Sequence, residues 1–272
     1  MNYINQGPIK AAISAVGAFV PEDKLTNADL EKMVDTNDEW ILARTGIKER
    51  RILKDPTKGS SFMAIKAVED LLKKRKINPI EIDAVIFATI TPDMNVAATA
   101  AYVASEIGAT NAFGYDLQAA CSGFLYGMSN ASNMIASGRY QKVLLIGADK
   151  MSSIVDYTDR TTCVIFGDGA GAVLFEASES GYGWEDEYLR SDGNGRIFLN
   201  IKAGGSMHPT STDTLKKGMH NLYQDGKSVF KYAVSEMTKA AEEILQRNEM
   251  KSNSISYLVP HQANKRIIDA IA

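Results

Sequence analysis

Apolar positions recur at helical spacing in several stretches of the chain. In residues 61–76, Met63, Ala67 and Leu71 fall on one stripe of a helix, and basic side chains close the stretch. Residues 227–248 keep this periodicity for longer, with an apolar side made of Val229, Phe230, Ala233, Met237, Ala240, Ala241, Ile244 and Leu245. We therefore predict helices over 61–76 and 227–248, and shorter ones over 26–34, from Asn37, over 96–108 and from residue 122 to Gly138.

Short runs of β-branched and other apolar residues lie between these helices. Residues 83–90 and 142–149 have the continuous apolar character of strands that are buried on both faces. We predict further strands at 9–21, 113–118, 169–178, 183–193 and 255–262. Because strands and helices alternate, the pattern predicts an α/β fold with a largely parallel sheet.

The C-terminal stretch ANKRIIDAIA begins a helix, and the chain stops inside it. This end would leave a parallel sheet in the second half of the chain incomplete. We therefore expect the second half to be incomplete at the C-terminus, and the sequence to be a truncated record of a longer chain.

The overall composition is ordinary for a globular protein and excludes several classes of function. Of 272 residues, 45% are hydrophobic and 23% charged, and the net charge of -3 gives no bulk attraction to nucleic acid or to an anionic membrane. The sequence has no apolar run of about 18 residues that would predict a membrane span. The N-terminal stretch also lacks the pattern of a secretory leader. We therefore expect a cytoplasmic protein.

Two cysteines, Cys121 and Cys163, and three histidines are the candidates for metal binding or covalent chemistry. The cysteines form no CxxC pair and the histidines no HxxxH pair, so we expect no metal site and no resident cofactor. So few cysteines in a chain without a leader are typical of a reducing compartment, where thiols stay free.

Cys121 lies where a strand turns into a helix, in the stretch AACSGF. A thiol at the start of a helix lies near unpaired N–H groups and the positive end of the helix dipole, so we expect a lowered pKa. The small neighbours Ala120, Ser122 and Gly123 leave room for a substrate carbonyl, and backbone N–H groups there could hold an oxyanion. The alternative is a buried structural cysteine that starts a core helix.

His261 is the second candidate, in the stretch LVPHQAN. The apolar run before it ends at Pro260, so the imidazole is expected at the carboxyl end of a strand, where ligands bind in parallel α/β sheets. Cys121 is expected at such an end too, and the two together indicate a nucleophile and its partner. Taken alone, His261 fits a surface histidine better than a catalytic one.

Four motifs together resemble the β-ketoacyl-acyl-carrier-protein synthase III family of the thiolase superfamily. They are TNDEWILARTGIKERR (36–51), AACSGF, IFGDGAGA (165–172) and VPHQAN, and their order and separation match along the whole chain. The GDGAG stretch is not a dinucleotide fingerprint, because it leads into a strand. The resemblance implies a thiolase-like, duplicated, layered α/β fold. Residues 1–178 would be the half that carries the cysteine, and 179–272 the half that carries the histidine.

The resemblance also implies a reaction. Cys121 would take an acyl group from acetyl-CoA or another short acyl-CoA. Malonyl-acyl carrier protein would then lose CO2, and its carbanion would attack the acyl-cysteine to give a 3-ketoacyl-acyl carrier protein, the start of type II fatty acid synthesis. A neutral His261 would stabilise the enolate by a hydrogen bond, without a metal. The implied enzyme is an acyltransferase, usually a homodimer.

Several positions match family residues that contact these substrates. Trp40, Arg44 and Arg160 match side chains that hold CoA, and Asn264 matches one near the pantetheine arm. Positions where the acidic carrier protein docks match Gln262, Lys231 and Arg266. Val96 matches a position where relatives have a larger residue that reaches the partner's acyl pocket. The family's second catalytic amide, an asparagine in a later motif, would lie beyond Ala272.

Two other classes of function stay open on the residues. One is a cysteine hydrolase that uses Cys121 and His261, with Asn264 as the orienting residue. The other is a non-catalytic acyl-CoA-binding subunit of the same fold. Within the superfamily, a hydroxymethylglutaryl-CoA synthase and a polyketide-type ketosynthase are further alternatives.

Overall fold

The computed structural model describes residues 9–272; residues 1–8, part of the N-terminal stretch without the leader pattern, lie outside this description. The described chain forms two compact units, each assembled from several parts of the sequence. Unit 1 contains the residues up to 23 together with 53–150 and 168–185, and unit 2 contains 24–52, 151–167 and 186–272. The predicted boundary between residues 178 and 179 concerns a duplication of the fold and stays a prediction.

Unit 1 is built on a five-stranded sheet with the order β1-β7-β6-β4-β5. Its strands are β1 (Ala11–Phe19), β4 (Ala84–Ala88), β5 (Phe113–Leu117), β6 (Lys142–Lys150) and β7 (Asp168–Ala177). β4 runs parallel to β5 and β6, whereas β7 runs antiparallel to β6 and β1. Four of the five strands therefore run in the same direction, as predicted, and only β7 runs opposite to them. An apolar run buried on both faces does not reveal the direction of its neighbours.

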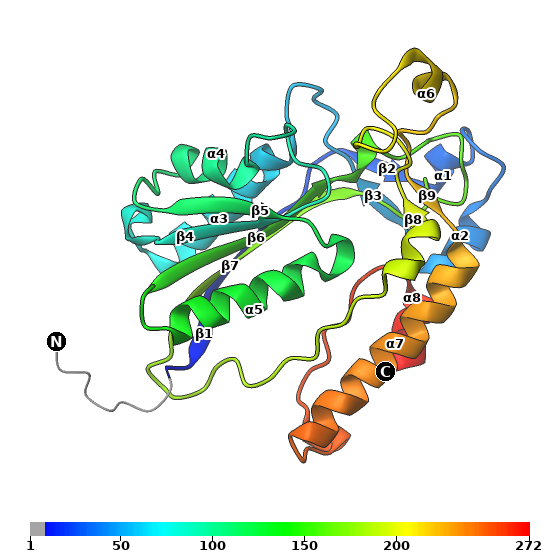
Figure 1. Cartoon of the computed structure of the whole chain (residues 1–272). Helices are drawn as coiled ribbons and strands as arrows, with labels where there is room; N and C mark the ends of the chain where they lie inside the picture. Colours follow the sequence, from blue (N-terminus) through cyan, green and yellow to red (C-terminus); the bar gives the residue numbers. More distant parts are fainter. Residues whose placement is uncertain (1–8) are drawn as a thin grey trace. The chain divides into compact units, whose positions relative to one another are not determined.

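Helices cover both faces of this sheet (Figure 1). On one face lie α3 (Ser60–Arg75) and α4 (Thr99–Glu106), and on the other lies α5 (Gly123–Ala136). Every residue of β4 is buried, and its side chains alternate between the two cores. The predicted helices and strands of unit 1 up to residue 178 are confirmed within a few residues of their expected ends.

Glycine allows α5 to approach the sheet closely. A Cβ atom built on Gly127 would lie 2.4 Å from a methyl carbon of Leu145 on β6. Opposite Gly147 of the same strand, the ring of Phe124 occupies the space that a side chain would need, 2.9 Å from the built Cβ. These two glycines therefore fix how near the helix that follows Cys121 lies to the central strand.

Unit 2 consists of short strands, helices and long connections. Two small sheets pair β2 (Lys24–Thr26) with β3 (Glu49–Arg51) and β8 (Leu199–Asn200) with β9 (Tyr223–Gln224). The helices are α1 (Asn27–Leu30), α2 (Asp38–Thr45), α6 (Thr212–Lys216), α7 (Gly226–Arg247) and α8 (Lys265–Ile271). Short 3-10 turns, here called η, complete the chain: η1 (Pro79–Glu81) and η2 (Ala120–Ser122) in unit 1, and η3 (Met151–Ser153), η4 (Gly193–Ile197) and η5 (Ser252–Ser254) in unit 2.

A small apolar core holds the first two segments of unit 2 together. Leu30 and Ile41 from the first segment pack with Val155, Cys163 and Val164 from the second. Thr26 and Asp29 form the capping box that starts α1, as their spacing predicts. The predicted helices from Asn37 and over 227–248 are confirmed as α2 and α7.

Two predicted strands, 183–193 and 255–262, are irregular in the structure. Trp184 donates one backbone hydrogen bond to Ala11 of β1 (2.7 Å), but no ladder of such bonds continues from it within the described chain. Leu258 and Val259 are 54% and 87% exposed. A strand forms only where a neighbouring backbone completes its hydrogen bonds, and an apolar run does not supply that neighbour. Over residues 9–272, every helix is too short or too polar to cross a bilayer.

Candidate functional site

Cys121 lies in unit 1, in the tight turn between β5 and α5. The short turn η2 leads directly into α5, and the N–H of Ser122 donates to the carbonyl of Ala119 (3.1 Å). Ala120 has a φ of 46°, a left-handed conformation that costs a residue with a side chain about 1–3 kcal/mol. Strained backbone of this kind clusters at functional sites. The turn therefore supports the choice of Cys121 as the nucleophile.

The electrostatic surroundings of Cys121 differ from the prediction. Burial of the thiol by surrounding protein raises its pKa above 9.0, the Asp149 carboxylate raises it further, and the N–H of Cys121 itself lowers it. The residue nevertheless has an exposed surface. Exposure measures the area that water touches, whereas the pKa responds to all the protein around the sulfur, so both statements hold. The predicted lowering of this pKa is wrong because desolvation outweighs the N–H group.

Asp149, near the end of β6, is the charged group that acts on Cys121. Its Oδ1 accepts four hydrogen bonds: from the hydroxyl and N–H of Thr91 (2.9 and 3.2 Å), the hydroxyl of Thr89 (2.9 Å) and the N–H of Ile90 (2.8 Å). Burial raises the pKa of Asp149, and these hydrogen bonds lower it. The sequence prediction missed this residue, although its place at the carboxyl end of an apolar strand was a usable signal.

Trp40 lies in unit 2 with two arginines around its ring. The guanidinium carbons of Arg160 and Arg44 lie 5.0 and 5.7 Å from the ring centroid, within the range of a cation–π contact. Nη1 of Arg160 donates to the backbone carbonyl of Asp35 (2.7 Å), which fixes the direction of the side chain. The structure thus brings together three of the four residues predicted to bind CoA, and Asn264 is not among the contacts of this group.

The position of Trp40 follows from how α2 begins and ends. The side chain of Asn37 accepts the N–H of Trp40 (2.7 Å) and caps the helix. Gly46 ends the helix with a φ of 74°, a conformation that glycine adopts readily. Ile41 is fully buried in the small core of unit 2. Trp40 is half-buried, so part of its ring packs on that core and part stays accessible.

His261 and Asn264 lie in unit 2 just before α8. Desolvation by the protein lowers the pKa of His261 below 6.5, so its imidazole is neutral at pH 7. Asn264 caps α8, because its side-chain oxygen accepts the N–H of Arg266 (2.8 Å). Cys121 belongs to unit 1 and His261 to unit 2. Their facing each other stays a prediction, and so does a role for Asn264 beside a substrate.

Two of the three residues predicted for carrier-protein docking lie near each other. The guanidinium carbon of Arg266 is 5.1 Å from the ring centroid of Phe230, and Lys231 is the next residue on α7. Both basic side chains belong to exposed residues. Gln262 instead donates to the carbonyl of Pro260 (3.2 Å), a bond within its own turn.

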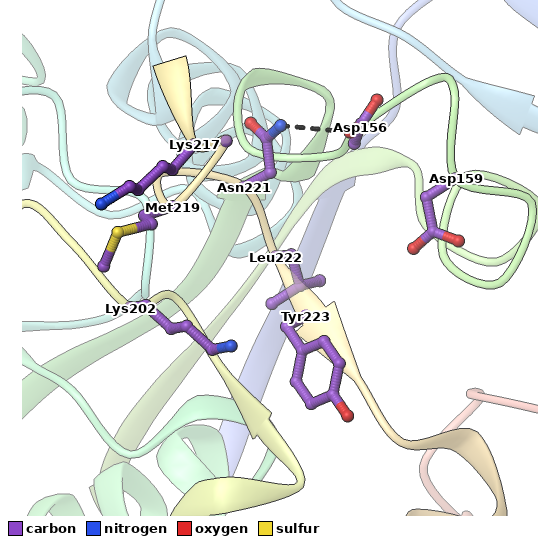
Figure 2. A pocket seen from close by; sticks show the side chains of 9 residues that line it. Asp156, Asp159, Lys202, Lys217, Met219, Asn221, Leu222 and Tyr223 are labelled. Carbon is purple, nitrogen blue, oxygen red and sulfur yellow. Dashed lines mark hydrogen bonds between the residues drawn. The ribbon is translucent and has the colours of Figure 1, made fainter. Parts of the chain in front are cut away.

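A hollow in unit 2 was not expected from the sequence. It encloses about 190 Å³ and is lined by Asp156, Asp159, Lys202, Lys217, Gly218, Met219, Asn221, Leu222 and Tyr223. Figure 2 shows Asn221 donating to Asp156 (3.3 Å). Asp156 also accepts two hydrogen bonds from Thr158, and Asp159 accepts from Thr161. The carboxylates are therefore occupied within their own turns, and none of the predicted site residues lines the hollow.

The described residues gather no group of three or more His, Cys, Asp or Glu side chains that could hold a metal ion. Both cysteines are free thiols, Cys121 exposed and Cys163 buried.

Comparisons with known proteins agree with the motifs. A family profile described as 3-oxoacyl-[acyl-carrier-protein (ACP)] synthase III matches residues 115–193, the part of the chain that contains Cys121. The chain is 56% identical over 266 residues to a β-ketoacyl-[acyl-carrier-protein] synthase III of Chlorobium chlorochromatii, a match that covers 97% of this chain and 81% of the relative. A protein of the same name from Phocaeicola vulgatus is 53% identical over 264 residues, with 97% and 79% covered.

The fold agrees as well. The solved β-ketoacyl-[acyl carrier protein] synthase III of Thermus thermophilus matches with a TM-score of 0.86 at 42% identity, covering 96% of this chain and 79% of that one. The 3-oxoacyl-[acyl-carrier-protein] synthase III of Aquifex aeolicus matches with a TM-score of 0.84 at 38% identity, with 96% and 79% covered. The identity of more than half the residues over nearly the whole chain establishes that this protein belongs to the 3-oxoacyl-[acyl-carrier-protein] synthase III family.

Proposed function

We propose that the chain is a β-ketoacyl-acyl-carrier-protein synthase III, an acyltransferase that joins a short acyl group from acyl-CoA to malonyl-acyl carrier protein. The observation that carries this proposal is the turn of Cys121. It places a thiol directly after Ala120, whose backbone is left-handed, at the head of a helix and inside the stretch that matches the family profile. A buried structural cysteine would not need such a strained turn.

The first half of the reaction moves the acyl group to Cys121. The thiol must lose its proton, and its sulfur then attacks the thioester carbonyl of acyl-CoA. The bond from carbonyl carbon to CoA sulfur breaks, and the CoA thiolate takes up a proton. Because burial raises the pKa of Cys121 above its usual value, the thiol is mostly protonated at pH 7. The Cys121 thiol must therefore lose its proton while its sulfur attacks the bound acyl-CoA.

The second half forms the carbon–carbon bond. The malonyl group on the carrier protein loses CO2, and negative charge collects on the oxygen of its thioester. A neutral imidazole can donate a hydrogen bond to that oxygen without adding charge to the site. The lowered pKa of His261 supports this role. The carbanion then attacks the acyl-cysteine, and the thiolate of Cys121 leaves to complete the cycle.

The CoA moiety would bind along α2. Trp40 offers a half-buried aromatic face for the adenine base, and Arg44 and Arg160 offer planar cations for base and phosphate. Asn264 would lie nearer the pantetheine arm. The acidic carrier protein would dock on basic side chains near α7 and α8, where Arg266 lies over Phe230, the residue before Lys231, and Gln262 follows His261.

We further propose that two copies pair through β5. This strand is the last in the order of the sheet, so its outer edge has no neighbouring strand within the described residues. Phe113 at its start and Tyr102 on α4 are 44% and 50% exposed. A second copy could extend the sheet and cover these side chains. The fully exposed Val96, held at a φ of 79°, would then reach the partner and influence the length of the acyl group.

We also propose that the protein acts in the cytosol and needs no resident cofactor. Free thiols at Cys121 and Cys163 fit the reducing cytosol, where acyl-CoA is available. The reaction as written needs the two thioester substrates and no metal or redox group.

Mass spectrometry after incubation with acetyl-CoA tests the proposal. We expect one acetyl group on Cys121, its loss when malonyl-acyl carrier protein is added, and release of CO2 with 3-ketoacyl product. Cys121→Ala should abolish the adduct and lower turnover at least about a thousandfold, while the matched Cys163→Ala should keep both. Free acetate without product would instead indicate a hydrolase, and binding without an adduct would indicate a non-catalytic subunit.

A further inference from the structure

Arg50 is a buried arginine whose partners are uncharged. It lies on β3 and is 3% exposed. Nε and Nη2 both donate to the backbone carbonyl of Val164, the former at 2.9 Å. Nη1 donates to the side-chain oxygen of Asn27. Burial lowers the pKa of Arg50 to about 10, so the side chain keeps its charge at pH 7. Burying a charge is costly, and here no carboxylate among these contacts compensates for it.

The first of these contacts reaches the segment that carries Arg160. Val164 lies four residues after Arg160, and its side chain is buried in the small core beside Cys163. The backbones approach closely in this region. A Cβ atom built on Gly167 would lie 3.1 Å from the carbonyl oxygen of Arg51 and 3.3 Å from the Cβ of Arg50. Arg50 therefore holds the 151–167 segment at a fixed distance from β3.

The second contact reaches both ends of α2. The side-chain nitrogen of Asn27 donates to Asp38, the first residue of the helix (2.7 Å), and to the carbonyl of Ile47, just after its last turn (3.0 Å). The oxygen of the same amide accepts the hydrogen bond from Arg50. One amide thus spans the helix that carries Trp40 and Arg44, and Arg50 holds that amide in place.

We propose that Arg50 is a positioning residue that aligns α2 with the 151–167 segment, so that Trp40, Arg44 and Arg160 stand ready for the nucleotide of acyl-CoA. The inference rests on the proposed function, because it assumes that this group of side chains binds CoA. Arg50 itself is buried and acts through Val164 and Asn27. Preorganisation of this kind lowers the free-energy cost of binding.

The shape of the guanidinium explains why arginine occupies this place. Its planar fork directs two donors to one carbonyl and a third to the amide on the other side. A lysine keeps the positive charge but has one ammonium group, which cannot serve both directions from a fixed point. Arg50→Lys therefore keeps the positive charge and removes the hydrogen-bond geometry, so the variant tests the geometry alone.

The test compares Arg50→Lys with the wild type. We expect Kd for CoA, measured by calorimetry, and KM for acetyl-CoA to rise about tenfold to a hundredfold, with a much smaller change in kcat and in KM for malonyl-acyl carrier protein. The rate at which iodoacetamide alkylates Cys121 in unit 1 should not change. General destabilisation would instead alter the alkylation rate and kcat together with KM, and that result would overturn the inference.

A second variant keeps the inference testable if Arg50→Lys does not fold. Asn27→Asp retains the acceptor for Arg50 but replaces the donor to Asp38 and Ile47, so it releases α2 while the arginine stays paired. We expect the same weakening of CoA binding. Unchanged affinity in a folded variant contradicts the role of Arg50. Failure of the wild type to bind CoA would contradict the proposed function, which is a different result.

Discussion

The turn that carries Cys121 and the helix that carries Trp40 are held in place by different forces. Beneath Cys121 lies a sheet whose central side chains are fully buried: Val85, Ile86 and Phe87 of β4 and Leu144, Leu145 and Ile146 of β6 are all 0% exposed. In unit 2, α2 buries only Ile41 and Thr45, and the 22-residue helix α7 has no buried residue within the described chain.

In unit 2, polar contacts supplement the small apolar core that holds α2 in place. Asn37 starts α2, Asn27 spans it, and Arg50 connects it to the 151–167 segment. A tightly packed core loses stability with almost any loss of side-chain volume, whereas a set of hydrogen bonds depends on the direction of each donor. Substitutions in the first region should therefore lower stability, and substitutions in the second should mainly change the affinity for acyl-CoA.

Truncation of two leucines tests this difference directly. Leu145→Ala on β6 should lose about 2–5 kcal/mol of unfolding free energy, because a cavity remains in a fully packed core. Leu245→Ala on the half-buried face of α7 should lose about 1 kcal/mol. Denaturant unfolding of the two variants measures both. Equal losses would mean that the two units are packed alike and would remove the contrast.

Trp40→Ala should weaken the use of acyl-CoA without disturbing the chemistry. The ring lies within cation–π distance of two arginines and is proposed to hold the adenine base, so its loss should raise KM for acetyl-CoA about tenfold while kcat changes little. Trp40→Phe keeps an aromatic face and is the matched control, with a smaller rise. A fall in kcat at constant KM would place Trp40 in the reaction itself and not in binding.

Asp149→Asn should produce the smallest effect, a change in the ionisation of Cys121. The carboxylate disfavours the thiolate, so removing its charge should lower the pKa of Cys121, and the alkylation rate by iodoacetamide should rise at a lower pH than in the wild type.

Asp116→Asn is the matched control for that profile. Its carboxylate caps α4 by accepting the N–H groups of Thr99 and Ala100, both at 2.8 Å. We expect its alkylation profile to match the wild type. If Asp149→Asn leaves the profile unchanged or moves it to higher pH, the carboxylate does not act on the thiol as described.

The periodicity of apolar residues was sufficient to predict the helices and strands that pack on a core. The stripe of Met63, Ala67 and Leu71 lies in α3, and the apolar runs at 83–90 and 142–149 contain β4 and most of β6. These side chains are buried in the structure. Where burial determines the local conformation, the pattern of apolar residues is enough to predict it.

The prediction errors occur where a partner distant in the sequence determines the local structure. Residues 255–262 are apolar enough for a strand, but Val259 is exposed and no neighbour completes a ladder within residues 9–272. β7 runs antiparallel because of its pairing with β6, which its own composition does not reveal.

The candidate site shows the same limits. Three of the residues expected near CoA, Trp40, Arg44 and Arg160, lie together in the structure, and their role in binding stays a prediction. The pKa of Cys121 was wrong in direction, because desolvation depends on atoms that no local motif contains. Arg50 was missed because a basic run such as KERR is typical of a solvated surface, and its burial depends on Val164 and Asn27.

In the proposed mechanism, Cys121 carries the acyl group, and His261 serves only the step that follows. The most direct measurement is the mass of His261→Ala after acetyl-CoA, and again after malonyl-acyl carrier protein. We predict that this variant acetylates Cys121 as the wild type does, then keeps the adduct without releasing CO2. Failure to acetylate, or normal release of CO2 and product, would contradict the account.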